Sequence, residues 1–136
     1  MTASRSGHTA TLLSDGKVLI AGGRASFGGG AWGETAQSSA VRSAGGYVYS
    51  YWLDERGARR PHATLLNNGK VLIGGGVTFA GGKQTFLGTA ELYDPAAGAF
   101  TPAGNMQAAR TALTATLLAS GKVLMSSYFN YTSAKQ

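Results

Sequence analysis

The chain has 136 residues, with 12 Lys or Arg, 6 Asp or Glu, 21 Gly and no Cys, and its formal net charge at pH 7 is +6. This length suits one domain at most; the glycine share argues against a helical bundle, because each glycine inside a helix costs about 1 kcal/mol, and the balance of 43% hydrophobic to 13% charged residues argues against a disordered chain. The absence of cysteine excludes disulfides, zinc–thiolate sites and cysteine nucleophiles, and no apolar run approaches the roughly 20 residues of a membrane span.

An internal repeat is the strongest feature of the sequence. The segment His8-Thr-Ala-Thr-Leu-Leu-Ser-Asp-Gly-Lys-Val-Leu-Ile returns from His62, and again from Leu113 with leucine in place of the histidine. The turn glycines of the three copies stand 53 and 52 residues apart, at Gly16, Gly69 and Gly121. A period near 50 residues predicts a repeat architecture built from similar supersecondary units.

Each copy predicts a β-hairpin. The residues Thr-Leu-Leu precede a turn that contains Asp-Gly, Asn-Gly or Ser-Gly, and glycine there supplies the positive φ of a tight hairpin turn. The strand that follows, Val-Leu-Ile or Val-Leu-Met, is continuously apolar, which predicts that both of its faces are covered. The glycine pair after this strand predicts a close approach of backbones near a central channel.

The remainder of the second unit predicts two more strands. Residues 89–95 alternate apolar and polar side chains, residues 96–98 form a turn, and residues 100–103 form an outer strand where an edge proline is tolerated. In the first unit, residues 35–41 and 46–52 occupy the same places in degenerate form. We therefore expect an all-β fold of antiparallel strands.

These motifs resemble those of the kelch-repeat β-propellers, in particular the bacterial galactose-oxidase-like type. The hairpin, the double glycine and Glu91-Leu-Tyr-Asp-Pro carry the resemblance, and Ser126-Ser127 departs from it where the third double glycine belongs. The resemblance implies four-stranded antiparallel blades: a first at about 5–53, a second at about 58–106 and half a third at about 110–136. Two and a half blades make an incomplete propeller with two exposed apolar blade faces. We expect further blades of the same polypeptide or other copies of the chain to complete it; an open sheet stack is the third possibility.

The long loops at 24–34 and 77–88, together with the arginines of the neighbouring connections, are the candidate binding face. Aromatic rings there offer stacking surfaces and arginines offer contacts to carboxylates or phosphates. The candidate residues are Arg5, Arg24, Phe27, Trp32, Arg59, Arg60, Phe79, Lys83, Phe86 and Arg110. The recurrence of arginine with the blade period favours the structural alternative, in which the rings cover blade ends and the arginines bond to loop carbonyls.

Two other groups of residues receive structural interpretations. His8 and His62 are nearly repeat-equivalent and should point similarly, and we expect hydrogen-bonded histidines at strand starts rather than metal ligands. Lys17, Lys70 and Lys122 follow the hairpin turns, on the face opposite the long loops, and are expected to be solvated. Nucleic-acid binding is therefore not the favoured use of the positive charge.

No catalytic residue, metal site or cofactor is predicted. The sequence has no nucleophile elbow, metalloprotease helix or paired carboxylates, and its glycine runs lack the helix of a phosphate loop. We expect a non-catalytic structural module that binds protein or carbohydrate, within a larger exported or cell-surface protein; a cytoplasmic location stays open. The alternative is a fragment of a galactose-oxidase-like copper oxidoreductase. The thioether-linked Cys–Tyr group of that enzyme cannot form from this chain, so its active site would lie elsewhere.

Overall fold

A computed structural model describes residues 4–26, 38–40, 49–51, 60–80 and 83–130, with residues 4–6, 24–26, 38–40, 49–51, 79–80 and 128–130 described in their backbone course alone. Every regular element in these ranges is a β-strand, as the sequence predicts. The strands are β1 (Ser4–Leu12), β2 (Val18–Ser26), β3 (Ser38–Ala40), β4 (Tyr49–Tyr51), β5 (His62–Leu65), β6 (Val71–Gly74), β7 (Val77–Ala80), β8 (Lys83–Phe86), β9 (Thr89–Asp94), β10 (Ala99–Asn105), β11 (Arg110–Leu117) and β12 (Val123–Asn130).

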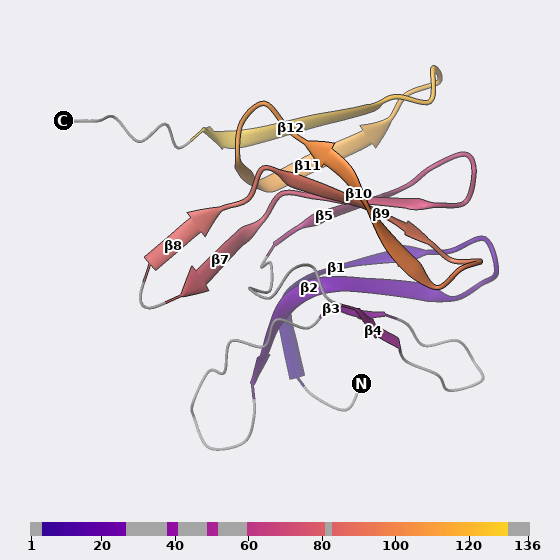
Figure 1. Cartoon of the computed structure of the whole chain (residues 1–136), viewed down its shortest axis with the longest axis horizontal. Helices are drawn as coiled ribbons and strands as arrows, with labels where there is room; N and C mark the ends of the chain where they lie inside the picture. Colours follow the sequence, from indigo (N-terminus) through magenta and orange to yellow (C-terminus); the bar gives the residue numbers. More distant parts are fainter. Residues whose placement is uncertain (1–3, 27–37, 41–48, 52–59, 81–82, 131–136) are drawn as a thin grey trace.

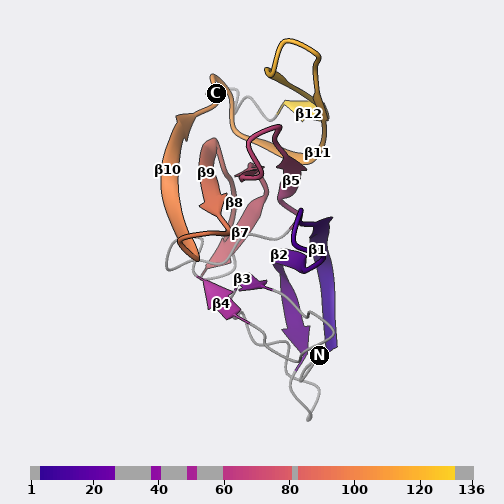
Figure 2. The ribbon, with the colours of Figure 1, turned by 90° about the vertical axis from the view of Figure 1, so that its right-hand side faces the viewer.

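The strands form three layers that follow the order of the repeats. Of these three layers, the β1–β2 hairpin, called the first hairpin here, lies lowest in Figure 1, with the short β3–β4 pair below it, and the β11–β12 hairpin, called the last hairpin, lies highest. Between them is the middle sheet, four antiparallel strands in the order β10-β9-β6-β5. The same order of layers is visible after a quarter turn in Figure 2. Each repeat therefore contacts the repeat next to it in sequence.

The three hairpins close with the same loop. In the first, Leu13 N–H donates to Lys17 C=O at 2.7 Å, and Gly16 N–H donates to Leu13 C=O at 3.0 Å, with Gly16 at φ 80°. The corresponding bonds recur in the other two hairpins at 2.8 to 3.0 Å. This pattern is the three-residue loop in which one left-handed glycine completes a type I turn. The sequence prediction of a turn that needs glycine is confirmed.

A second shared feature lies nine residues before each turn glycine. Gly7, Arg60 and Ala112 occupy this position, and their φ angles are 68°, 54° and 50°. In the first and last hairpins this residue is left out of the strand pairing, which passes from Ser6 to His8 and from Thr111 to Leu113. A left-handed residue is thus kept at this position even where glycine is not present, and the pairing continues past it without a shift of register, so the three repeats share their backbone course here.

The middle sheet presents a row of apolar side chains to the first hairpin. The pairing aligns Leu65 with Val71, Val71 with Tyr93, and Tyr93 with Phe100, so the row crosses all four strands. The rings of Tyr93 and Phe100 meet with centroids 4.8 Å apart. Cross-strand rows of this kind are the unit that stabilises a sheet.

The core lies between this row and the first hairpin. Its buried members are Leu13, Leu19 and Ala21 from the first hairpin, and Val71, Ile73 and Tyr93 from the middle sheet. Val71 and Ile73 face the first hairpin, whereas Leu72 between them points to the other face of β6, where Gly74 lies beside Met125 of the last hairpin. Both faces of the central strand are therefore used, as its continuously apolar sequence predicts.

Close approach at a glycine pair is confirmed where the middle sheet meets the last hairpin. Gly76 N–H donates to the carbonyl of Arg110 at 2.8 Å. A Cβ placed on Gly75 would lie 2.5 Å from Leu113 Cδ1 and 2.7 Å from the Arg110 carbonyl oxygen. Only glycine leaves room for this contact, and φ of 67° at Gly75 also favours it.

Two sequence predictions need correction. Residues 77–88 are not an irregular loop, because β7 pairs with β8 from Val77 with Phe86 to Ala80 with Lys83. In the first unit, β3 lies beside β2 and pairs with β4, so among the described residues the expected four-stranded sheet is seen in the middle unit alone. The degenerate segment 35–41 has no counterpart of Leu92 and Tyr93, the apolar residues of β9.

The described residues contain no helix long and apolar enough to cross a membrane.

Candidate functional site

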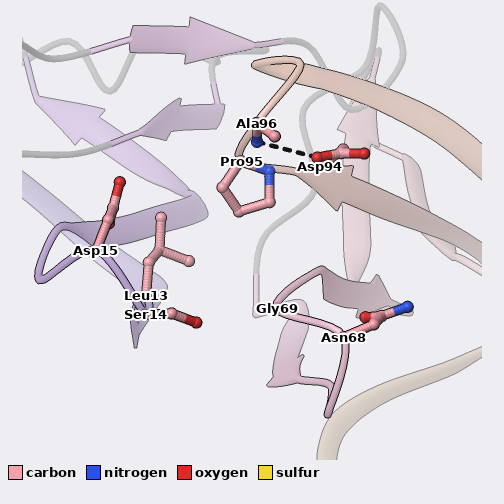
Figure 3. A pocket seen from close by; sticks show the side chains of 8 residues that line it. All are labelled: Leu13, Ser14, Asp15, Asn68, Gly69, Asp94, Pro95 and Ala96. Carbon is pink, nitrogen blue, oxygen red and sulfur yellow. Dashed lines mark hydrogen bonds between the residues drawn. The ribbon is translucent and has the colours of Figure 1, made fainter.

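The turns of the first hairpin and of the middle sheet meet around an open hollow. Its volume is about 300 Å³, and the residues that line it come from three turns, as Figure 3 shows: Leu13, Ser14, Asp15, Asn68, Gly69, Asp94, Pro95 and Ala96. These turns come together because successive repeats stack in register. A Cβ on Gly69 would lie 3.5 Å from the Ser14 hydroxyl, so neighbouring repeats touch at this end.

Asp94 is the most heavily bonded polar residue of the hollow. It ends β9, where its Oδ1 accepts hydrogen bonds from Ala96 N–H at 2.9 Å and Ala97 N–H at 3.4 Å, while Oδ2 accepts from Lys70 Nζ at 2.9 Å. The hydrogen bond from Lys70, followed by that from the backbone of Ala96, lowers the pKa of the Asp94 carboxyl. Asp94 therefore ties the β9–β10 turn to the second hairpin turn.

Asp15 bonds within its own turn, to Lys17. Its Oδ1 accepts the Lys17 backbone N–H at 3.0 Å and its Oδ2 accepts Lys17 Nζ at 2.6 Å, and this side-chain bond is the main cause of the lowered pKa of Asp15. Asn68 occupies the same place in the second turn, with its Oδ1 accepting the Lys70 backbone N–H at 3.1 Å. A side-chain oxygen two residues before its backbone donor stabilises turns of this kind.

The hollow combines hydrogen-bonding groups with apolar walls. Carboxylate, amide and hydroxyl groups come from Asp15, Asn68 and Ser14, and Leu13 and Pro95 supply the apolar surface. Both carboxylates carry a lysine partner, so the site is close to neutral. Groups of this kind suit a ligand rich in hydroxyl or amide groups. Within the described ranges, no three metal-ligating side chains lie together.

The predicted site residues that the structure describes lie at the other end of the strands. The hairpin turns gather on the right of Figure 1, whereas β7 and β8, which contain Phe79, Lys83 and Phe86, project on the left. Lys83 is exposed and Phe86 is half-buried.

The predicted arginines are placed as follows. Arg5 and Arg24 lie in the first hairpin, in adjacent pairs of the ladder away from its turn. Arg60 is exposed, and its backbone N–H donates to Gly7 C=O at 2.9 Å. The Arg110 guanidinium donates from Nη1 to the Ser127 hydroxyl at 3.1 Å. The remaining candidates, Phe27, Trp32 and Arg59, lie outside the described residues.

The two histidines differ from expectation. Counted back from the turn glycine, His62 corresponds to Thr9 and not to His8, because the second repeat is one residue shorter between histidine and glycine. Successive strand residues point to opposite faces, so the prediction that both histidines point similarly is wrong. The Nδ1 atom of His8 is buried and makes no hydrogen bond, which also differs from the expected hydrogen-bonded histidine.

Lys17 and Lys122 are exposed, as the sequence predicts, whereas Lys70 is half-buried. Lys17 and Lys70 also form ion pairs at 2.6 and 2.9 Å, which the sequence prediction did not include. The partner of Lys17 is visible in the sequence as an aspartate two residues earlier, but Asp94 lies 24 positions from Lys70 and reaches it only through strand pairing. The Asp-Pro step before a turn was the available signal.

No protein-family model matches the sequence, and no curated protein matches it.

Proposed function

We propose that the chain is a kelch-type propeller segment that acts as a non-catalytic structural and binding module of a larger, exported protein. The carrying observation is that three hairpins with the same loop, the same left-handed residue nine positions before the turn glycine and the same pairing register stack in sequence order. Repeat units of this kind cannot bury their apolar faces alone and gain stability from their neighbours. Because each unit depends on its neighbours for stability, we infer that the stack serves as a rigid scaffold.

Hydrogen exchange of the intact chain tests the scaffold role. If the layers form one continuous stack, the inner-strand amides of β2, β6 and β12 share a common opening reaction that increases with added urea. Strand β8, in which Lys83, Gln84 and Thr85 are exposed, exchanges faster and serves as the internal reference. Independent exchange of the first hairpin and the middle sheet would contradict a continuous scaffold.

The hollow supports a second candidate function, the binding of a carbohydrate at the turn end. Its polar groups suit sugar hydroxyls, and Pro95 can cover the apolar face of a pyranose ring. The test is a screen of immobilised oligosaccharides followed by calorimetric titration of the best hit. Ala96→Trp fills the hollow, and the matched control Ala97→Trp adds the same ring to the adjacent exposed residue that does not line it.

We expect Ala96→Trp to abolish binding and Ala97→Trp to retain it. A loss with Lys83→Ala instead would place binding at the β7–β8 end, the face that the sequence analysis favours. Equal binding by all three variants would contradict both sites.

A further inference from the structure

The layers stack with unlike faces in contact. In the first hairpin, Leu19 and Ala21 of β2 point into the core, and they stand three and five residues after the turn glycine. In the middle sheet, the opposing residues of β6 are Val71 and Ile73, which stand two and four residues after the turn glycine Gly69. Equivalent strands therefore present opposite faces to their shared interface. We call the face with residues at three and five positions after the turn glycine the odd face, and the face with residues at two and four positions the even face.

The second internal contact follows the same rule. Gly74 stands on the odd face of the middle sheet, and a Cβ there would lie 3.3 Å from the end of Met125, which stands on the even face of the last hairpin. Each layer thus places its odd face on the even face of the next layer. Both internal interfaces are head-to-tail contacts of one kind.

The odd face of the last hairpin is left open. Leu124 is the counterpart of Leu19, yet Leu124 is 59% exposed and Leu19 is 1% exposed. Leu118 corresponds in the same way to Leu13, with exposures of 40% and 4%. Residues that form the core in one repeat are therefore at the surface in another.

The even face of the first hairpin is open at the other end of the stack. Leu12, Val18 and Ile20 are identical to their counterparts Leu65, Val71 and Ile73, which pack in the first interface. Leu12 is 63% exposed, and Val18 and Ile20 keep partial exposure, whereas Val71 and Ile73 are buried. The two open faces are thus copies of two faces that already fit each other inside the chain.

From this correspondence we propose that a second copy of the chain docks head to tail, with the odd face of its last hairpin on the even face of the first hairpin of its neighbour. The contact would bring Leu118 and Leu124 of one copy against Leu12, Val18 and Ile20 of the other, and it would reproduce the first internal interface. Such a contact is heterologous, because the two copies contribute different surfaces. The proposal rests on the stacking of repeats that underlies the proposed function.

Complementation of two variants tests the proposal. Leu124→Asp places a charge on one open face and Leu12→Asp on the other, and both positions are exposed, so the internal core is untouched. Each variant keeps one intact face. Far-UV circular dichroism and the urea midpoint check that each remains folded. Ala97→Asp, on the exposed β9–β10 turn, is the matched control for added charge.

We expect the wild-type chain and Ala97→Asp to associate in sedimentation velocity as concentration rises. Each face variant alone is expected to be monomeric, with association weakened about tenfold or more because a charge enters an apolar interface. An equimolar mixture of the two variants forms a one-to-one dimer, since one partner offers an intact odd face and the other an intact even face.

Three results would overturn the proposal: a wild-type chain that stays monomeric up to about 1 mM, association of either variant alone at wild-type strength, or folded variants that remain monomeric when mixed. If hydrogen exchange shows a continuous stack while complementation fails, the scaffold role stands and only this docking is wrong. If exchange shows independent layers, both are wrong.

Discussion

Gly75→Ala is expected to destabilise the chain strongly, because this residue lies where the middle sheet meets the last hairpin. An alanine Cβ would stand 2.5 Å from Leu113 Cδ1 and 2.7 Å from the Arg110 carbonyl oxygen. That carbonyl already accepts the Gly76 N–H at 2.8 Å, so the backbone cannot move away without losing the bond. The left-handed φ of 67° adds a second penalty for a residue with a side chain.

The magnitude follows from these two terms. A left-handed conformation costs a residue with a Cβ about 1–2 kcal/mol, and overpacking costs about 1–3 kcal/mol. We therefore expect Gly75→Ala to lower the free energy of unfolding by about 2–5 kcal/mol. Gly121→Ala is the matched control, because φ is 78° there but no atom lies within 4 Å of the added Cβ, so it should lose only about 1–2 kcal/mol.

Urea unfolding followed by circular dichroism measures both losses from the shift in midpoint at constant slope. We expect the Gly75 variant to lose clearly more free energy of unfolding than the Gly121 variant. Equal losses would mean that the close approach of the two layers is not present in solution.

The remaining predictions concern the core, an open face of the stack and the loss of stability at low pH. Ile73→Ala should lower the free energy of unfolding by about 2–5 kcal/mol, because Ile73 is 1% exposed between two layers; a loss below about 0.5 kcal/mol, as for a surface site, would contradict the core. Leu124→Ala should change the stability of the dilute monomer by at most about 0.5 kcal/mol, and a core-sized loss would show that this face is covered within the chain. The hydrogen bonds from Lys17 and Lys70 lower the pKa values of Asp15 and Asp94, so their contribution is present above the ordinary aspartate pKa and is lost as pH falls through the lowered values. Urea midpoints measured from pH 6 to pH 2 should therefore fall less steeply in Asp94→Asn than in the wild-type chain, and parallel curves would contradict the role of Asp94.

Local signals in the sequence account for most of the fold. The turn glycines and the apolar strands predict the three hairpins, and the alternation of residues 89–95 predicts β9 with Pro102 on the outer strand β10. The β7–β8 hairpin was missed because residues 77–88 lie between the recurring motifs, and Lys83-Gln-Thr-Phe lacks the alternation of apolar and polar residues that marks a strand. Repeat length alone does not reveal strands within such a segment.

The candidate site was harder to predict because it is built between repeats. The pair formed by Lys70 and Asp94 joins two turns, and the distance of 2.9 Å depends on the register of β6 against β9. Likewise, His62 stands one residue nearer to its turn glycine than His8 does, so the two histidines lie on opposite faces of equivalent strands. This difference is visible only when the repeats are aligned on the turn glycines. Sequence similarity identifies the units, whereas register decides which side chains meet.

Nuclear Overhauser contacts of methyl groups across the two internal interfaces test the stacking order most directly. We expect contacts from Leu19 to Ile73 and from the Met125 methyl to the Hα atoms of Gly74, since these groups lie in the two internal interfaces. In the dilute monomer, Leu124 should show no contact to Leu19 or Ile73. A direct contact between the first and last hairpins, or the absence of both predicted contacts in a folded chain, would contradict the stacked arrangement.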